Sequence, residues 1–108
     1  MGRLSAKLRS LQWGEGGSAI GFWCPGCDGI HVVVVKKPIG SVWEWDGNVD
    51  APTISPSILV SGGGDNKVCH SFVKAGQIQF LGDCTHALKD QTVPIPDWPY
   101  AEGEYGGV

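Results

Sequence analysis

The fold of this chain is decided by residues 67–86, which read KVCHSFVKAGQIQFLGDCTH. Polar and apolar residues alternate on both sides of Ala75-Gly76, and two such runs around a two-residue turn are typical of a β-hairpin. When the strands are paired across this turn, Cys69 and Cys84 fall on the apolar face, whereas His70 points to the opposite face. We therefore predict that the two cysteines can reach a common metal ion.

Residues 24–27, CPGC, carry the most specific chemistry in the sequence. Two residues between a pair of cysteines let both thiolates approach one ion while the backbone turns tightly. A redox-active pair with this spacing stands at the start of a helix, but strand-like residues flank this one on both sides. The pattern predicts a structural zinc ion held by Cys24, Cys27 and Cys69, with Cys84 and His86 competing for the fourth position.

Three more side chains are candidate supports or alternative ligands of this site. His31 follows Cys27 by four residues and could either fold back as a ligand or hydrogen-bond to one. His70 and Asp83 are predicted to support the ligands in the same way. Simpler alternatives stay open, because the two cysteines of the hairpin could be small core residues without a metal, and each histidine could be an ordinary hydrogen-bonding residue.

The composition favours a protein of strands and turns. The 108 residues include 17 Gly and 7 Pro, which imply many tight turns and few long helices. We predict a mostly β fold, with one small domain over residues 1–108 built of hairpins in a zinc-ribbon-like arrangement. Residues 1–7 and 101–108 are expected to be loosely ordered, and Thr85 to Lys89 to add at most one short helical turn.

Other strands are expected at residues 8–13, 19–23, 31–36 and 42–45, where apolar, β-branched or aromatic residues gather between turn signals. Residues 51–60, APTISPSILV, contain Pro52 and Pro56, which cannot donate to a sheet ladder. We predict an edge strand or loop there as far as about Ser57. Residues 62–66 are expected to be a flexible connection.

Charge and hydropathy exclude several classes of protein. A formal net charge of -3 and a pI near 5.4 provide no broad field for a polyanion, so general nucleic-acid binding is not expected. The basic residues Arg3, Lys7 and Arg9 are expected to form a solvated N-terminal end. No apolar run approaches the ~18 residues of a membrane span, and no signal-peptide core follows the basic residues, so we expect a cytoplasmic protein with reduced cysteines.

Four segments together resemble a known family: FWCPGCDGIHVV, VWEWDG, APTISPSILV and CHSFVKAGQIQFLGDCTHALKDQTVPIPDWP. The resemblance is to an uncharacterised phage and prophage protein family that is often mislabelled as ammonia monooxygenase. Its motif runs C-P-x-C, P-T-x-x-P-S, C-H-x-F and D-[CS]-x-H, and it matches Cys24, Cys27, Pro52, Thr53, Pro56, Ser57, Cys69, His70, Asp83, Cys84 and His86. Because the motif admits serine at position 84, the resemblance favours His86 as the fourth ligand. Asp28 and Asp90 stand where the family is expected to have glycine.

The resemblance implies a small phage accessory protein in the cytoplasm of a bacterial host, acting in host takeover or counter-defence, but it supplies no reaction. The residues favour a non-catalytic binding module, in which zinc ties two hairpins together and exposed aromatics such as Trp43, Trp45 and Trp98 engage an unknown host or phage protein. The alternative for the tryptophans is a place in the core, and alternation favours burial of the face that Trp43 and Trp45 share. A homo-oligomer is also open.

The alternative is a small zinc-dependent hydrolase acting on a nucleotide, a phosphodiester or an amide. In that case His70, His31 or Asp83 would be the general base, and no catalytic residue is fixed by the sequence alone. A thiolate-rich shell favours the binding module, because fully ligated cysteine sites are usually structural.

Overall fold

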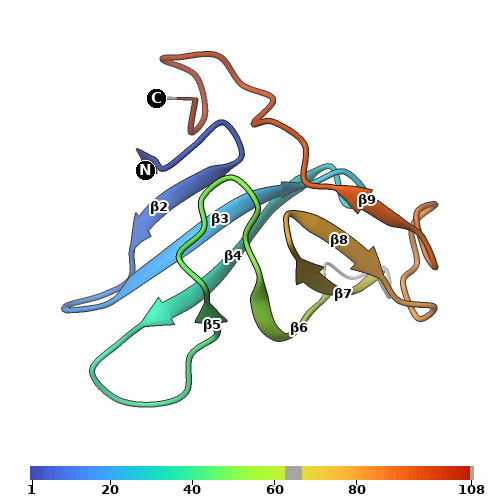
Figure 1. Ribbon diagram of the computed structural model, residues 1–108, viewed down its shortest axis with the longest axis horizontal. Helices are drawn as coiled ribbons and strands as arrows, with labels where there is room; N and C mark the ends of the chain where they lie inside the picture. The colour runs from blue at the N-terminus through green and yellow to red at the C-terminus, as the bar shows by residue number, and fades with distance from the viewer. Residues whose placement is uncertain (63–66, 108) are drawn as a thin grey trace.

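The computed structural model describes residues 1–62 and 67–107, which form strands and turns and contain no helix (Figure 1). The predicted mostly β fold is confirmed. In the described part of the chain, no helix is long and apolar enough to cross a membrane. The strands are β1 (Gly2–Arg3), β2 (Leu8–Gln12), β3 (Ser18–Cys24), β4 (Gly29–Lys36), β5 (Glu44–Trp45), β6 (Ile54–Gly62), β7 (Lys67–Lys74), β8 (Gln77–Phe80) and β9 (Thr92–Pro94).

The first sheet contains β1 to β4 in sequential, antiparallel order. Its longest hairpin is the one predicted around CPGC, with Phe22 opposite His31 and Cys24 opposite Gly29. Alternation along β3 and β4 buries Phe22, Cys24 and His31 on the inner face of the sheet. The tip of this hairpin therefore carries both cysteines of the CPGC segment to one end of the core.

The second sheet contains β5 to β9, also antiparallel and in sequential order. Its hairpin of β7 and β8 has the predicted register, with Lys74 opposite Gln77. An edge strand or loop was predicted as far as about Ser57. Residues 51–53 precede the strand, but the edge position is wrong for Ile54 and Ser55, because β6 begins at Ile54 and these two residues pair with β5. The register of β6 and β7 shifts between Ile54 and Ile58, and this irregularity accommodates Pro56 inside the sheet. The flexible connection predicted at residues 62–66 lies almost wholly outside the described residues.

After β8 the chain makes turns. At most one short helical turn was predicted there, at Thr85 to Lys89. The Lys89 N–H donates to the His86 carbonyl at 3.3 Å, and the Gln91 N–H donates to the Leu88 carbonyl at 3.1 Å. The chain then returns as β9, which pairs with β8 and was not predicted. Proline is tolerated at Pro94 because this strand lies at the edge of the sheet.

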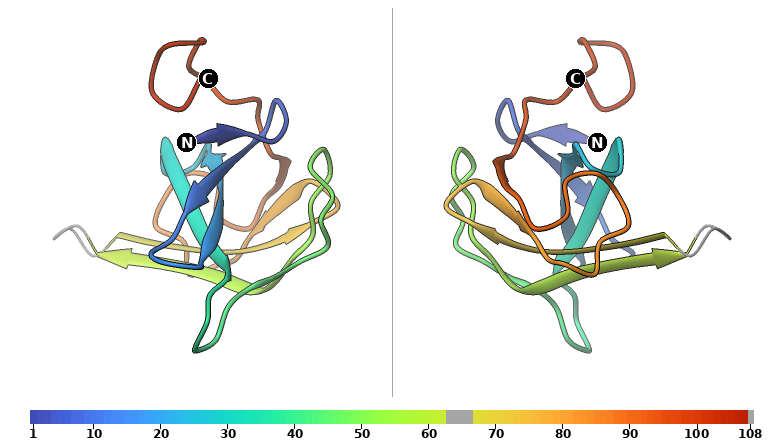
Figure 2. Two further views of the ribbon diagram at one scale, coloured as in Figure 1. Left: turned by 90° about the vertical axis from the view of Figure 1, so that its left-hand side faces the viewer. Right: turned by 90° about the vertical axis from the view of Figure 1, so that its right-hand side faces the viewer.

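The two sheets pack across each other, and the first sheet stands over the second (Figure 2). Their facing sides bury a continuous apolar core, with Leu8, Ile20, Phe22 and Val33 from the first sheet and Ile54, Ile58, Val73, Ile78 and Phe80 from the second. Cys24, Cys69 and Cys84 belong to the same buried cluster. The cysteines thus lie where the sheets meet.

The C-terminal segment packs against the N-terminal strands, and it overturns two expectations. Arg9 is not solvated: only 2% of it is exposed, its guanidinium donates to the Ser5 and Leu8 carbonyls at 2.7 and 3.0 Å, and its Nε donates to the Gly106 carbonyl. Trp98 is not displayed for a partner either, because it is 7% exposed and its ring lies 4.9 Å from the Arg9 guanidinium carbon.

Candidate active site and metal centre

The CPGC segment turns tightly between β3 and β4. Cys24 ends β3, and its sulfur accepts a hydrogen bond from the Cys27 N–H at 3.4 Å. Gly26 is required because an added Cβ would collide with the imidazole of His86, which lies against the turn. Asp28 closes the turn with φ at 52°, a conformation that favours glycine. The turn therefore directs the sulfurs of Cys24 and Cys27 toward the same place.

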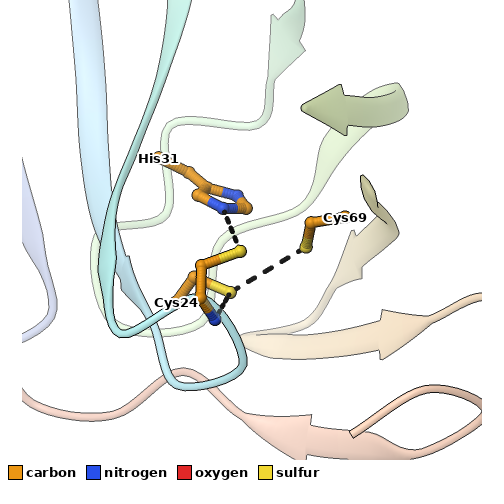
Figure 3. Close-up of side chains that lie close together, drawn as sticks. Cys24, His31 and Cys69 are labelled. Atoms are coloured by element: carbon orange, nitrogen blue, oxygen red, sulfur yellow. Dashed lines mark hydrogen bonds between the residues drawn. The ribbon is translucent and has the colours of Figure 1, made fainter. Parts of the chain in front are cut away.

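Strand alternation brings two more ligands to that point. Cys69 on β7 and His31 on β4 are buried on the inner faces of their sheets, and Figure 3 shows Cys24, His31 and Cys69 converging from three strands. The donor atoms of Cys24, Cys27, His31 and Cys69 all lie within 4.8 Å of one another. This cluster could hold a metal ion.

The spacing of the donor atoms fits a tetrahedral ion. Zinc–sulfur bonds of about 2.3 Å place two tetrahedral sulfurs roughly 3.8 Å apart, and a sulfur and a nitrogen slightly closer. The Cys24 and Cys69 sulfurs are 4.0 Å apart, and His31 Nε2 is 3.4 Å from the Cys27 sulfur. The other ring nitrogen of His31, Nδ1, is buried and has no hydrogen-bond partner among the described residues.

The thiols of the cluster influence one another's protonation. A hydrogen bond from Cys69 lowers the pKa of Cys24 to about 3, and the same contact together with burial raises the pKa of Cys69. Desolvation of the Cys27 sulfur, helped by the charge of the Cys24 thiolate, raises the pKa of Cys27 to about 11. A cation of charge two would replace the protons on these sulfurs and remove their mutual repulsion.

The structure places His86 and Cys84 beside this cluster, grouped with Cys69. His86 Nδ1 accepts the Leu88 N–H at 3.2 Å, so in the neutral ring the proton is on Nε2. That nitrogen lies 3.4 Å from the Cys69 sulfur and donates to it. The Cys84 sulfur, in contrast, contacts the backbone of His70.

A second constellation lies on the outer face of the second sheet. His70 Nδ1 is 3.0 Å from a carboxylate oxygen of Asp83, and His70 Nε2 is 3.0 Å from the hydroxyl of Ser57. Because a carboxylate can only accept, Nδ1 carries the proton and Nε2 accepts from the serine hydroxyl. Ser57, His70 and Asp83 therefore form a continuous hydrogen-bond chain.

Three elements position this chain of residues. Ser57 follows Pro56 in the irregular part of β6, where the indole of Trp43 donates to its carbonyl at 3.3 Å. His70 lies on β7 directly opposite Leu59, so that the serine two residues earlier is its diagonal neighbour. Asp83 comes from the turns after β8. Leu59 and Phe72, both exposed, flank the serine and the histidine on this face.

The arrangement has the chemistry of a nucleophilic hydrolase. An aspartate orients the imidazole and stabilises its protonated form, and the imidazole removes the proton of the serine as it attacks a carbonyl. Sequence reasoning named His70 and Asp83 only as supports or as a general base, and it missed Ser57 as a nucleophile. The available signal was the motif itself, in which a serine, a histidine and an aspartate all recur.

Fold and site thus define a small all-β protein with a serine–histidine–aspartate chain on one face of a sheet and a cysteine–histidine cluster behind it. A protein-family model described as "Bacterial ubiquitination-like system serine protease (BubE)" matches residues 4–81, and the chain belongs to this family. Ser57 and His70 lie within the match, and Asp83 lies two residues beyond it. No curated protein and no solved structure matches the chain.

Proposed function

We propose that this protein is a serine peptidase of a bacterial ubiquitination-like system, with Ser57 as nucleophile, His70 as general base and Asp83 as the residue that orients His70. The observation that carries the proposal is the pair of 3.0 Å hydrogen bonds that link the three side chains. The description of the family supports the same reaction class. Peptidase chemistry replaces the binding module that the sequence alone favoured.

The proton transfers of the proposed reaction use only these side chains and water. Ser57 Oγ attacks the carbonyl carbon of the scissile amide while His70 Nε2 takes its proton, and the protonated imidazole then gives this proton to the leaving amine. Water, deprotonated by His70, hydrolyses the resulting ester and restores the serine. Asp83 stays ionised throughout and stabilises the imidazolium.

Zinc fits the cysteine–histidine cluster as a structural ion. We place Cys24, Cys27, Cys69 and His31 as its ligands and His86 as a donor to the Cys69 sulfur, which departs from the fourth ligand that the resemblance favoured. When bound, zinc supplies a rigid link between the β3–β4 hairpin and β7. A zinc-dependent hydrolase is the weaker proposal, because four protein ligands leave no open position for water.

The proposed substrate is a polypeptide of the ubiquitination-like system. Leu59 and Phe72 are 58% and 37% exposed beside the catalytic pair, and large exposed apolar side chains next to a nucleophile suit contact with an extended chain. A host or phage protein as partner, homo-oligomerisation, a phage origin and a cytoplasmic location stay predictions.

The direct test is labelling with a fluorophosphonate, which reacts with activated serine hydroxyls whatever the natural substrate. We expect Ser57→Ala to lower the rate of labelling by at least about 1,000-fold, because the nucleophile and its base act as a unit. Ser55→Ala is the matched control, since Ser55 is an exposed serine on the same strand and should be dispensable. Equal labelling of the wild type and Ser57→Ala, or no labelling of the folded wild type, would refute the proposal and favour a binding module.

A further inference from the structure

Cys84 makes two contacts with the backbone of a single residue, the catalytic His70. Its sulfur accepts the His70 N–H at 3.3 Å and donates to the His70 carbonyl at 3.2 Å. Cys84 is 4% exposed, so water does not compete for these bonds. The Cys84 sulfur therefore contacts both backbone polar groups of His70, the N–H and the carbonyl.

The reason for this arrangement lies in the length of the neighbouring strand. β8 ends at Phe80, opposite Ser71, so among the described residues no strand lies beside Val68 to His70 of β7 on that side. The turns after β8 take its place: the Leu81 N–H donates to the His70 carbonyl and the Thr85 N–H to the Val68 carbonyl, each at 2.9 Å, and side chains supply the rest of the missing ladder. Cys84 makes such bonds to His70. Thr85 makes the equivalent bonds to Val68: its hydroxyl accepts from the Val68 N–H at 2.9 Å and donates to the Val68 carbonyl at 3.3 Å.

A metal-bound cysteine could not make both contacts. A thiolate ligand has no proton to donate, and its negative charge would face the His70 carbonyl oxygen at 3.2 Å. In addition, the group of Cys24, Cys27, His31 and Cys69 supplies four ligands without Cys84. The contacts of Cys84 thus require the protonated thiol, which is a hydrogen-bonding group and not a ligand.

We infer that Cys84 is a positioning residue for His70 and lies outside the metal shell, an inference that rests on the proposed peptidase function. Together with the Leu81 N–H, which also donates to the His70 carbonyl, the Cys84 contacts fix where β7 holds the imidazole relative to Ser57 and Asp83. Since a displacement of roughly 1 Å at a catalytic group can cost about 100-fold in rate, losing both contacts lowers turnover without removing a group that touches the substrate.

The test compares three variants with the wild type under single-turnover and steady-state conditions, with a peptide ester as substrate. Cys84→Ala should lower kcat by about 10- to 100-fold with KM nearly unchanged, and Cys84→Ser should restore most of the loss, because a hydroxyl can accept and donate in the same way. Thr85→Val is the matched control: it removes the equivalent contacts to Val68, which bears no catalytic group, and should keep kcat within about twofold.

Two further measurements make the inference independent of activity alone. Zinc content by elemental analysis should be the same in the wild type, Cys84→Ala and Cys84→Ser, and hydrogen exchange of the His70 amide should be faster in Cys84→Ala. Loss of zinc in Cys84→Ser, or an equal fall of kcat in Thr85→Val, would overturn the inference while the peptidase stands. A wild type that does not react with the fluorophosphonate would overturn both.

Discussion

At the residue scale, two neighbours on β7 have separate tasks. Cys69 is buried and points into the cluster that could hold a metal ion, whereas His70 is on the opposite face, between Ser57 and Asp83. Alternation in a strand makes this division automatic. We propose the inner residue as a metal ligand and the outer residue as the general base.

The assignment of His31 and His86 leads to a first prediction. We expect His31→Ala to bind zinc much more weakly than the wild type, and His86→Ala to retain it with an affinity lower by about 10- to 100-fold, because His86 only donates to the Cys69 sulfur. Zinc affinity measured by competition with a chromophoric chelator separates the two. The reverse order of affinities would return His86 to the metal shell.

Single residues also show why the sequence could predict some of the site and not all of it. The CPGC spacing and the hairpin alternation were sufficient to bring Cys24, Cys27 and Cys69 together. Whether His31 or His86 faces those sulfurs depends on how two sheets pack, which no local pattern contains. Asp28 and Asp90, noted as replacements of expected glycines, have φ angles of 52° and 64°, so the backbone keeps the conformation that favours glycine.

At the element scale, the hairpin of β7 and β8 was predictable to its register, but β6 and β9 were not. Alternation around a two-residue turn is local information, and it was enough for the hairpin. The position of β6 depends on an irregularity that hides Pro56 within the sheet, and β9 is defined only by the partner it meets. The proposed nucleophile, Ser57, lies in this irregular part of β6, which is one reason why it was missed.

The turn of this hairpin carries a second prediction. Gly76 has φ at 77° and an added Cβ would lie 2.9 Å from Ala51 Cα, whereas Gly47 has φ at 81° and nothing within 4 Å of its added Cβ. We expect Gly76→Ala to lower the free energy of unfolding by about 1–3 kcal/mol more than Gly47→Ala does, because only Gly76 adds crowding to the same backbone strain. Denaturant unfolding of the two variants measures the difference, and equal losses would show that the turn can move away from Ala51.

At the scale of the whole molecule, the cysteine–histidine cluster joins the two sheets at one end of a small core. Cys24, Cys27 and His31 come from the first sheet and its hairpin tip, and Cys69 comes from the second sheet. The opposite face of the first sheet is closed by the C-terminal segment around Arg9.

Removal of the zinc ion proposed at this cluster should therefore destabilise the entire fold. Binding of a structural zinc ion contributes on the order of 10 kcal/mol, comparable with the total stability of a small domain of about 5–15 kcal/mol. We expect a chelator, or Cys24→Ser, to abolish the cooperative transition seen by calorimetry and to abolish fluorophosphonate labelling with it. Returning zinc should restore both to the chelated wild type. A sharp thermal transition in metal-free protein would contradict this prediction.

The packing of the C-terminal segment on the first sheet can be tested through Arg9. Arg9→Met keeps an unbranched side chain but removes the guanidinium donor from the buried Ser5 carbonyl and from the Gly106 carbonyl, whereas the Leu8 carbonyl keeps the Leu4 and Ser5 N–H groups. We therefore expect a loss of about 2–4 kcal/mol in the free energy of unfolding. Arg3→Met is the control, because Arg3 is exposed and should change stability by less than about 0.5 kcal/mol. Urea titration gives both values, and a neutral Arg9→Met would show that the C-terminal segment does not depend on the guanidinium.

The opposite orientations of Cys69 and His70 restrict how this protein can change in length. Inserting or deleting one residue of β7 beside them would reverse both side chains, so that the imidazole would enter the core and the thiol would reach the solvent. The insertion or deletion of a single codon would thus remove both the proposed metal ligand and the proposed base from their places. Inserting or deleting two residues would return both side chains to their original faces. Changes in the length of this part of the strand are therefore expected to involve an even number of residues.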